Sequence, residues 1–241
     1  MIPKNIILTS KEPPLQYIKL LQEFNPDFSI YFFDDESARN LIAKHFPAIV
    51  LQAYDKVKPT AYKADLFRYC ALQLLGGVYS DLYIPYGKSF DQVWDLSLDR
   101  IFLVQDTDPS MIQVATMACP KNSAFMAQCI EMAVNNILNE FYGASPFSIT
   151  GPHMAWQCFS EYTGQADASI GLYPARHSDH SAVQIDYRLA KTKGEIRKTV
   201  TEAVYLDQHG QFVFAYKENK YRGHRNHADY YWHAWRVKNV Y

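Results

Sequence analysis

Apolar runs and helical patterns alternate along the first part of the chain. The short runs rich in Ile, Phe and Tyr have the length of buried strands, and the segments between them place apolar residues at helical spacing. Proline marks two boundaries, because the pair at 13 and 14 suits a helix start and Pro47 ends a later helix. This order predicts an α/β fold built around a sheet. The predicted elements are a strand over 4–9, a helix over 13–24, a strand over 28–35 and a helix over 36–46.

A helix, a turn and a further strand follow in the segment from 60 to 84. Residues 60–75 carry apolar side chains at helical spacing, and Gly76 and Gly77 then end the helix. The run after the two glycines predicts a strand over 78–84. The apolar positions at helical spacing are Ala64, Phe67, Ala71 and Leu74.

The second half of the chain predicts a strand pair, two helices and a hairpin. The hairpin is indicated by two short apolar runs around Asp207, Gln208, His209 and Gly210. No internal repeat, low-complexity tract or linker interrupts the pattern, so we expect one domain over 1–241. The predicted elements are strands over 101–105 and 112–118, a helix over 122–140, a helix that begins at Gly151 and Pro152, and hairpin strands over 204–206 and 212–216.

Composition narrows the class of protein. Among 241 residues, 48% are hydrophobic and 20% are charged, which indicates a folded globular chain. The formal net charge of −1 gives no overall field that would attract nucleic acid. The apolar run at the amino terminus is too short for a signal sequence or a membrane span, and on this ground we expect a cytoplasmic protein.

Three charged residues fall around the helix, turn and strand of residues 60–84. Asp65 and Arg68 are three residues apart, so they share a helix face, and Asp81 lies in the strand that follows. Ligands of open α/β sheets collect at the carboxyl ends of strands, where Asp81 is expected. One interpretation is therefore a site with two carboxylates and a guanidinium. The other is an ordinary Asp65–Arg68 ion pair with Asp81 beginning a turn.

The string KADLFRYCALQLLGGVYSDLY at 63–83 resembles the signature of the DXD-containing sugar transferases of glycosyltransferase family 32. Looser matches extend the resemblance over nearly the whole chain, namely IPK at 2–4, FDD at 33–35, ITGP at 149–152 and the closing HAW at 233–235. The signature positions matched in order and spacing are Lys63, Ala64, Asp65, Leu66, Arg68, Tyr69, Leu72, Gly76, Gly77, Tyr79 and Asp81.

The resemblance implies a GT-A fold, a Rossmann-like α/β/α sandwich with a central mixed sheet, that binds a nucleotide sugar and transfers the sugar with retention of configuration. It implies that Asp65 and Arg68 contact the donor sugar, that Tyr79 lines the pocket, and that Asp81 is the first DXD carboxylate and a metal ligand. The catalytic residues expected on this basis are Asp81, Asp65 and Arg68. The full donor-binding set implied is Ile7, Thr9, Asp65, Arg68, Tyr79, Asp81, Gly151 and Pro152.

One position departs from the family pattern. The second DXD aspartate would ligate Mn2+ or Mg2+, and Tyr83 stands in its place. A phenol is a poor ligand for these hard cations at neutral pH.

Three substitutes for the missing ligand follow. A weakened metal site would use Asp81, the diphosphate and His233 or His227, and we rank it first. In the second alternative, basic side chains hold the diphosphate without a metal. In the third, the protein has lost its activity. The candidate basic residues are Arg222, Arg225 and Arg236.

The function expected is that of a retaining glycosyltransferase. It would move a hexose or N-acetylhexosamine from a nucleotide sugar, with a UDP-sugar favoured, to a glycan, lipid-linked or protein acceptor, and a peripheral association with a membrane stays open. The alternative, prompted by Tyr83, is a non-catalytic nucleotide-sugar or glycan-binding protein on the same fold. A dinucleotide enzyme is set aside, because no G-x-G-x-x-G follows the first strand.

Three further pairs of residues keep two interpretations each. Asp34 and Asp35 are expected either to contact a ribose or base of the donor or to cap the next helix. Asp106 and Asp108 are expected either to orient an acceptor hydroxyl or to form a turn. The pair Trp232 and Trp235 stacks on an acceptor sugar, or closes the core.

Overall fold

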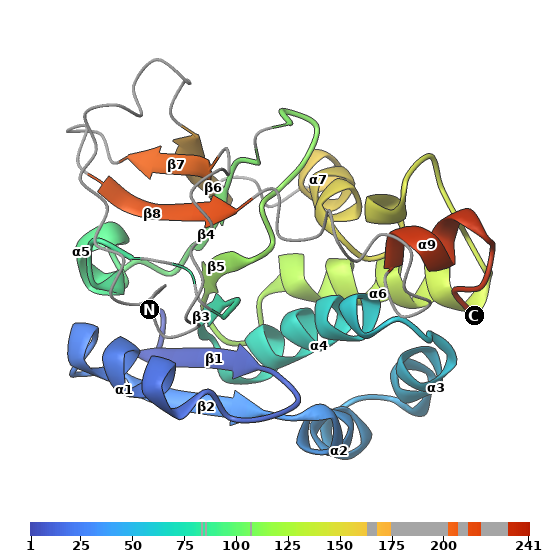
Figure 1. Cartoon of the computed structure of the whole chain (residues 1–241), viewed down its shortest axis with the longest axis horizontal. Helices are drawn as coiled ribbons and strands as arrows, with labels where there is room; N and C mark the ends of the chain where they lie inside the picture. Colours follow the sequence, from blue (N-terminus) through green and yellow to red (C-terminus); the bar gives the residue numbers. More distant parts are fainter. Residues whose placement is uncertain are drawn as a thin grey trace.

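A mixed sheet of eight strands runs through the protein (Figure 1). The computed structural model describes residues 1–82, 84, 86–106, 108–162, 168–174, 202–206, 212–217 and 231–241. The strand order is β2-β1-β3-β5-β4-β6-β7-β8. The strands are β1 (Asn5–Thr9), β2 (Ser29–Phe33), β3 (Gly77–Ser80), β4 (Ile101–Val104), β5 (Thr116–Cys119), β6 (Ala168–Pro174), β7 (Glu202–Leu206) and β8 (Phe212–Lys217).

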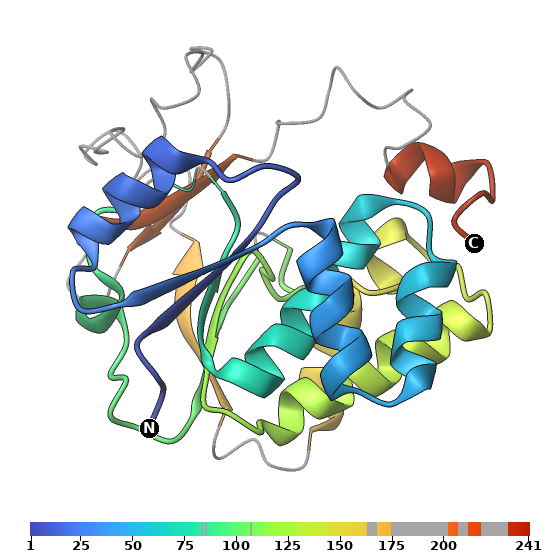
Figure 2. The ribbon, with the colours of Figure 1, turned by 90° about the horizontal axis from the view of Figure 1, so that it is seen from below.

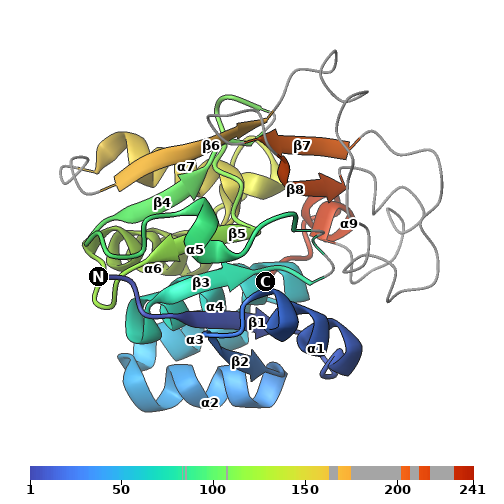
Figure 3. The same ribbon diagram turned by 90° about the vertical axis from the view of Figure 1, so that its left-hand side faces the viewer.

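The strand directions divide the sheet into a parallel part and a mixed part, which Figure 3 shows from the side. Strand β1 pairs in parallel with both β2 and β3. Strand β5 is antiparallel to its neighbours β3 and β4, β4 is parallel to β6, and β7 and β8 form an antiparallel hairpin. The carboxyl ends of β1, β2 and β3 therefore lie at one edge, where an open α/β sheet collects its ligands.

Helices cover both faces of the sheet (Figure 2). One core lies under α2, α3, α4, α6 and α7, and a second lies under α1 and α5. This α/β/α arrangement confirms the predicted sandwich. No helix in the described part of the chain is both long and apolar enough to cross a bilayer. The helices are α1 (Leu15–Phe24), α2 (Asp35–His45), α3 (Ala48–Lys56), α4 (Thr60–Leu75), α5 (Phe90–Val93), α6 (Ala124–Leu138), α7 (Pro152–Glu161), α9 (Tyr231–Arg236) and the 3-10 turn η1 (Pro146–Ser148).

Side-chain alternation in the strands supplies both cores. In β1, Ile7 lies in the core under α4, whereas Ile6 and Leu8 lie in the core under α1. In β3, Tyr79 faces α4 and Val78 faces the other side. This period of two determines which side chains beyond β3 can reach α4.

The sequence placed most elements near their observed bounds. The first strand and helix, the second strand, α4, α6 and the β7–β8 hairpin lie within a few residues of the prediction. All the described strands belong to one sheet, and the division into a single domain stays a prediction.

Two expectations were wrong in detail, because the 78–84 strand ends at Ser80 and the 112–118 strand is regular only from Thr116. The sequence analysis made no prediction for α3. Helix α4 has no single apolar face, because every residue from 65 to 72 is buried while Ala64 and Leu74 are only partly covered. A helix enclosed by neighbours all round loses the amphipathic pattern.

The turn between α4 and β3 requires two glycines. Gly76 has φ +61° and Gly77 has φ +109°, both in the region that favours glycine. A Cβ on Gly77 would also lie 2.5 Å from the Asn5 carbonyl oxygen of β1. The close approach lets β3 enter the sheet immediately after α4.

We predict that Gly77→Ala lowers the free energy of unfolding by at least about 2 kcal/mol, because the new methyl meets backbone and the φ angle is strained. Gly151→Ala is the comparison, since Gly151 has φ −94° and its new methyl would lie 3.3 Å from a side-chain oxygen of Asp65, so its loss of stability should be smaller than that of Gly77→Ala. Urea unfolding of the wild type and both variants measures these free energies of unfolding. Equal stability of the two variants would contradict this explanation of the turn.

Candidate active site

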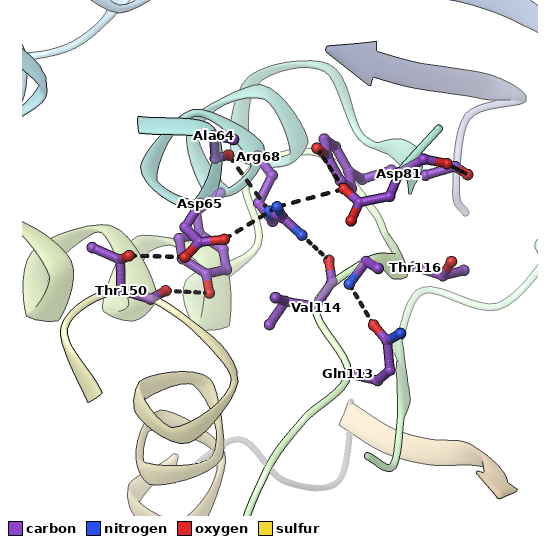
Figure 4. Close-up of polar contacts among 12 residues, drawn as sticks. Ala64, Asp65, Arg68, Asp81, Gln113, Val114, Thr116 and Thr150 are labelled. Atoms are coloured by element: carbon purple, nitrogen blue, oxygen red, sulfur yellow. Dashed lines mark hydrogen bonds and ion pairs between the residues drawn. The ribbon is translucent and has the colours of Figure 1, made fainter. Parts of the chain in front are cut away.

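Arg68 lies at the centre of the candidate site (Figure 4). It is buried on α4, and its Nη2 lies 3.1 Å from Asp65 Oδ1 and 3.6 Å from Asp81 Oδ1. Nη1 donates to the carbonyl oxygen of Val114, just before β5. The guanidinium thus joins α4, the end of β3 and the segment leading into β5, and both predicted carboxylates converge on it.

Tyr79 and Asp81 point to the same side because they are two residues apart in an extended segment. The Tyr79 hydroxyl donates to Asp81 Oδ1 at 3.2 Å, and the Arg68 guanidinium lies 4.5 Å from the centre of the Tyr79 ring. Burial raises the pKa of Tyr79, so its hydroxyl keeps its proton and acts as a donor. The Asp81 side chain retains 31% exposure, which leaves it open to a ligand.

Asp65 is held from the side opposite to Arg68. The hydroxyl of the buried Thr150 donates to Asp65 Oδ2 at 2.9 Å, and the Tyr69 hydroxyl donates to the Thr150 carbonyl at 2.8 Å. Gly151 lies against Asp65, because a Cβ there would be 3.3 Å from Oδ2. Sequence reasoning gave no role to Thr150 or Tyr69, although Tyr69 is four residues from Asp65 and so shares its helix face.

The two groups of the buried pair respond to burial in opposite ways. Desolvation raises the pKa of Asp65 to about 6, while Arg68 and the Thr150 hydrogen bond oppose the shift. Burial alone would lower the pKa of Arg68, yet the surrounding Tyr79, Asp81 and Asp65 raise it, so Arg68 stays charged. The site therefore holds a permanent cation between one carboxylate that titrates near neutrality and one that is partly exposed.

The remaining predicted donor residues are distributed around this centre. Ile7 pairs with Tyr79 in the sheet and its side chain is fully buried, whereas Thr9 ends β1 at the same edge as Asp81. Pro152 begins α7, and its carbonyl accepts from the Ile112 amide. The structure thus brings Thr9 to the ligand edge and leaves the Ile7 side chain in the core.

The predicted metal ligands do not form a cluster in the part of the chain that the structure describes. No group of three or more His, Cys, Asp or Glu side chains suited to a cation occurs among those residues. His233 lies on α9, which packs against α4 and η1. Tyr83 and His227 lie outside the described residues, as do Arg222 and Arg225.

Asp81 nevertheless fits one ligand position of a divalent cation. Its carboxylate is a hard oxygen donor, partly exposed at the carboxyl end of β3. A cation there would need further oxygen ligands from the substrate or from water.

Other candidate residues have structural roles in the described contacts. Asp34 caps α2 through the Ser37 amide, which confirms the capping interpretation. Asp108 accepts from the amide and hydroxyl of Ser110, as turn residues do. Trp235 donates its indole N–H to the Tyr142 carbonyl and Trp232 packs edge-on against Phe147. Neither Trp232 nor Trp235 is fully buried, so both interpretations of this pair stay open.

Residues 13–116 match the family described as the glycosyltransferase sugar-binding region containing the DXD motif. The match includes α4, β3 and every charged residue of the site. The resemblance predicted from the motif is therefore confirmed over residues 13–116.

Two curated relatives from Schizosaccharomyces pombe are similar to the chain. The inositol phosphoceramide mannosyltransferase 3 is 31% identical over 134 residues, which cover 54% of this chain and 36% of the relative. The initiation-specific alpha-1,6-mannosyltransferase is 35% identical over 89 residues, which cover 34% of this chain and 22% of the relative. The aligned part of this chain thus spans about a third or less of either relative.

A solved structure shows the same fold. The UDP-bound glycosyltransferase domain of the YGT toxin superimposes with a TM-score of 0.51 and 9% identity, covering 81% of this chain and 82% of that domain. The likeness confirms the GT-A fold.

We predict that the free energy of unfolding of the wild type rises relative to that of Asp65→Asn as the pH falls from 7 to mildly acidic values. The pKa of Asp65 is about 6 in the folded chain and 3.8 in the reference state, so the folded protein binds the proton more tightly. This stabilisation is complete below pH 3.8 and is lost as the pH rises through 6. Between about pH 4.5 and 7 the loss amounts to about 2 kcal/mol.

Urea unfolding of wild type and Asp65→Asn at several pH values tests this prediction. The difference between their free energies of unfolding should shift against the wild type as the pH rises. A shift of the opposite sign would mean that Arg68 outweighs burial and that the pKa of Asp65 is depressed.

Proposed function

We propose that this chain, whose residues 13–116 match the DXD sugar-binding region, is a retaining glycosyltransferase that moves a hexose from a nucleotide sugar to a glycan or lipid-linked acceptor. One observation carries the proposal. Asp65, Arg68 and Asp81 meet at the carboxyl edge of the sheet, within the matched region. Two carboxylates that share one buried guanidinium provide acceptors and donors in a fixed geometry.

The pair Asp65 and Arg68 is suited to the hydroxyls of a donor sugar. A carboxylate accepts hydrogen bonds from hydroxyl groups, and a guanidinium donates in a planar fork. Both side chains are held in place before any ligand arrives, by Thr150 on one side and the Val114 carbonyl on the other. Preorganised polar groups of this kind discriminate strongly between sugars that differ in one hydroxyl.

Asp81 is suited to the diphosphate end of the donor. A divalent cation, Mn2+ or Mg2+, would offset the charge that develops on the leaving nucleoside diphosphate. Asp81 would supply one carboxylate ligand to that cation, and Arg68, at 3.6 Å, keeps the carboxylate oriented. Since Tyr83 stands where the family has its second aspartate, we expect weak cation binding without donor and tighter binding with it.

The nature of the sugar and acceptor is supported by the relatives. Both named relatives are mannosyltransferases, which favours a hexose, and one name includes an inositol phosphoceramide, which supports a lipid-linked acceptor. The superimposed toxin domain holds UDP, which supports a UDP-sugar donor. We also propose a cytoplasmic location, with which the four buried free cysteines are compatible.

A non-catalytic nucleotide-sugar or glycan-binding protein is the second candidate function. Tyr83 is the observation that favours it, because loss of a metal ligand weakens leaving-group stabilisation. Binding of donor without turnover would identify this case.

We predict that the purified protein hydrolyses or transfers sugar from at least one UDP- or GDP-linked hexose in the presence of Mn2+, and that Asp81→Asn lowers this rate by about 100-fold or more. Release of the nucleoside diphosphate measures both reactions. Asp27→Asn is the matched control, because Asp27 is an exposed carboxylate paired only weakly with Lys4 at 3.5 Å.

Two results would contradict the proposal. Wild-type rates in Asp81→Asn would remove the end of β3 from the donor site. Donor binding by calorimetry with no nucleotide release under any metal condition would replace the transferase with the binding protein.

A further inference from the structure

A buried chain of hydroxyl groups lies on the side of β3 opposite to Arg68. The Ser80 and Tyr86 oxygens are 2.8 Å apart, and those of Tyr86 and Thr116 are 2.9 Å apart. Ser80 Oγ also donates to the main-chain carbonyl of Asp81 at 2.9 Å. All three hydroxyl side chains are buried, so no solvent competes for these bonds.

Proton counting gives the hydroxyl chain a direction. Each hydroxyl has one hydrogen, and that of Ser80 is used on the Asp81 carbonyl. With the Ser80 hydrogen on the Asp81 carbonyl, Tyr86 donates to Ser80 and Thr116 donates to Tyr86. Hydrogen bonds aligned in this way strengthen one another, and the chain ends on the candidate active-site residue.

The same hydroxyl chain joins the end of β3 to Tyr86, six residues further along the chain. Ser80 is the last residue of β3, and Tyr86 bridges Phe214 of β8. The next amide, of Gly87, donates to the Val213 carbonyl at 2.7 Å, and the Tyr86 ring packs against Phe90 and Phe214. The Tyr86 hydroxyl thus connects Ser80, at the end of β3, to Thr116 of β5.

The Asp81 backbone is held at both of its polar groups. Its amide donates to the Ala115 carbonyl at 2.7 Å, and its carbonyl accepts from Ser80. Its carboxylate emerges on the other side, 3.6 Å from Arg68. A carboxylate that must meet a guanidinium and a ligand together needs such a fixed backbone.

We propose that Tyr86 is a positioning residue, whose hydroxyl fixes the backbone of Asp81 through Ser80 and so sets the affinity of the site for a nucleoside diphosphate with its cation. This inference rests on the proposed function and deepens it. The inference also connects the β7–β8 hairpin to the candidate site, because Tyr86 bridges Phe214 of β8 and packs against its ring.

Tyr86→Phe tests the proposal, because it removes the hydroxyl and keeps the ring that packs on Phe90 and Phe214. We expect affinity for UDP or GDP with Mn2+ to fall by about tenfold. Tyr54→Phe, which removes the hydroxyl of another buried tyrosine, on α3, is the matched control and should bind as the wild type does.

A double-mutant cycle with Asp81→Asn shows whether Tyr86 acts through Asp81. If it does, Tyr86→Phe costs no further affinity once Asp81 is neutralised, so the two effects are not additive. Full additivity would overturn the proposal, because it would mean that Tyr86 acts on the fold in general.

Hydrogen exchange of the Asp81 amide gives a readout that needs no ligand. Tyr86→Phe should speed exchange at Asp81 by about tenfold and leave Ala118, in the middle of the sheet, unchanged. If wild type binds no nucleotide yet Asp81 exchange rises in this way, the proposed function fails and the positioning role stands. Unchanged exchange at Asp81 would overturn the positioning role whatever the nucleotide result.

Discussion

The candidate site depends on one buried guanidinium. Arg68 is charged at every accessible pH, and burying it without partners would be prohibitive. Asp65, Asp81 and the Val114 carbonyl supply those partners from three separate segments. Removing one member of such a set leaves an uncompensated charge and typically costs about 3 to 5 kcal/mol. The ion-pair network therefore constrains how α4, β3 and the approach to β5 pack together.

The sheet makes this convergence possible. Two glycines let β3 follow α4 directly, and the period of two along β3 turns Tyr79 and Asp81 toward Arg68 and Ser80 away from it. The side chains on the two sides of β3 therefore have different functions. Charged groups face the ligand edge, and neutral hydroxyls on the other side hold the backbone that carries Asp81.

Local patterns predicted the elements and the charged triad, because helical spacing and strand alternation are properties of short segments. The spacing of Asp65 and Arg68, with Asp81 in the next strand, gave the charged site as one of two interpretations, and the resemblance of residues 63–83 to the family signature favoured it. Thr150 and the Val114 carbonyl were not, since they reach Asp65 and Arg68 from segments 85 and 46 residues away. The all-round burial of α4 was missed for the same reason, because α2, α3 and α6 cover it only in the folded chain.

Donor binding by Arg68→Lys tests most directly whether the buried fork of Arg68 organises a sugar-nucleotide site. Lysine keeps the positive charge that Asp65 and Asp81 require, but a single ammonium cannot bridge both carboxylates and the Val114 carbonyl in one plane. Calorimetry of the bound nucleotide sugar with Mn2+, on a variant whose circular dichroism matches the wild type, should give a Kd at least about tenfold weaker. An unchanged Kd in a folded Arg68→Lys variant would show that the Asp65–Arg68 pair is structural and that the donor binds elsewhere.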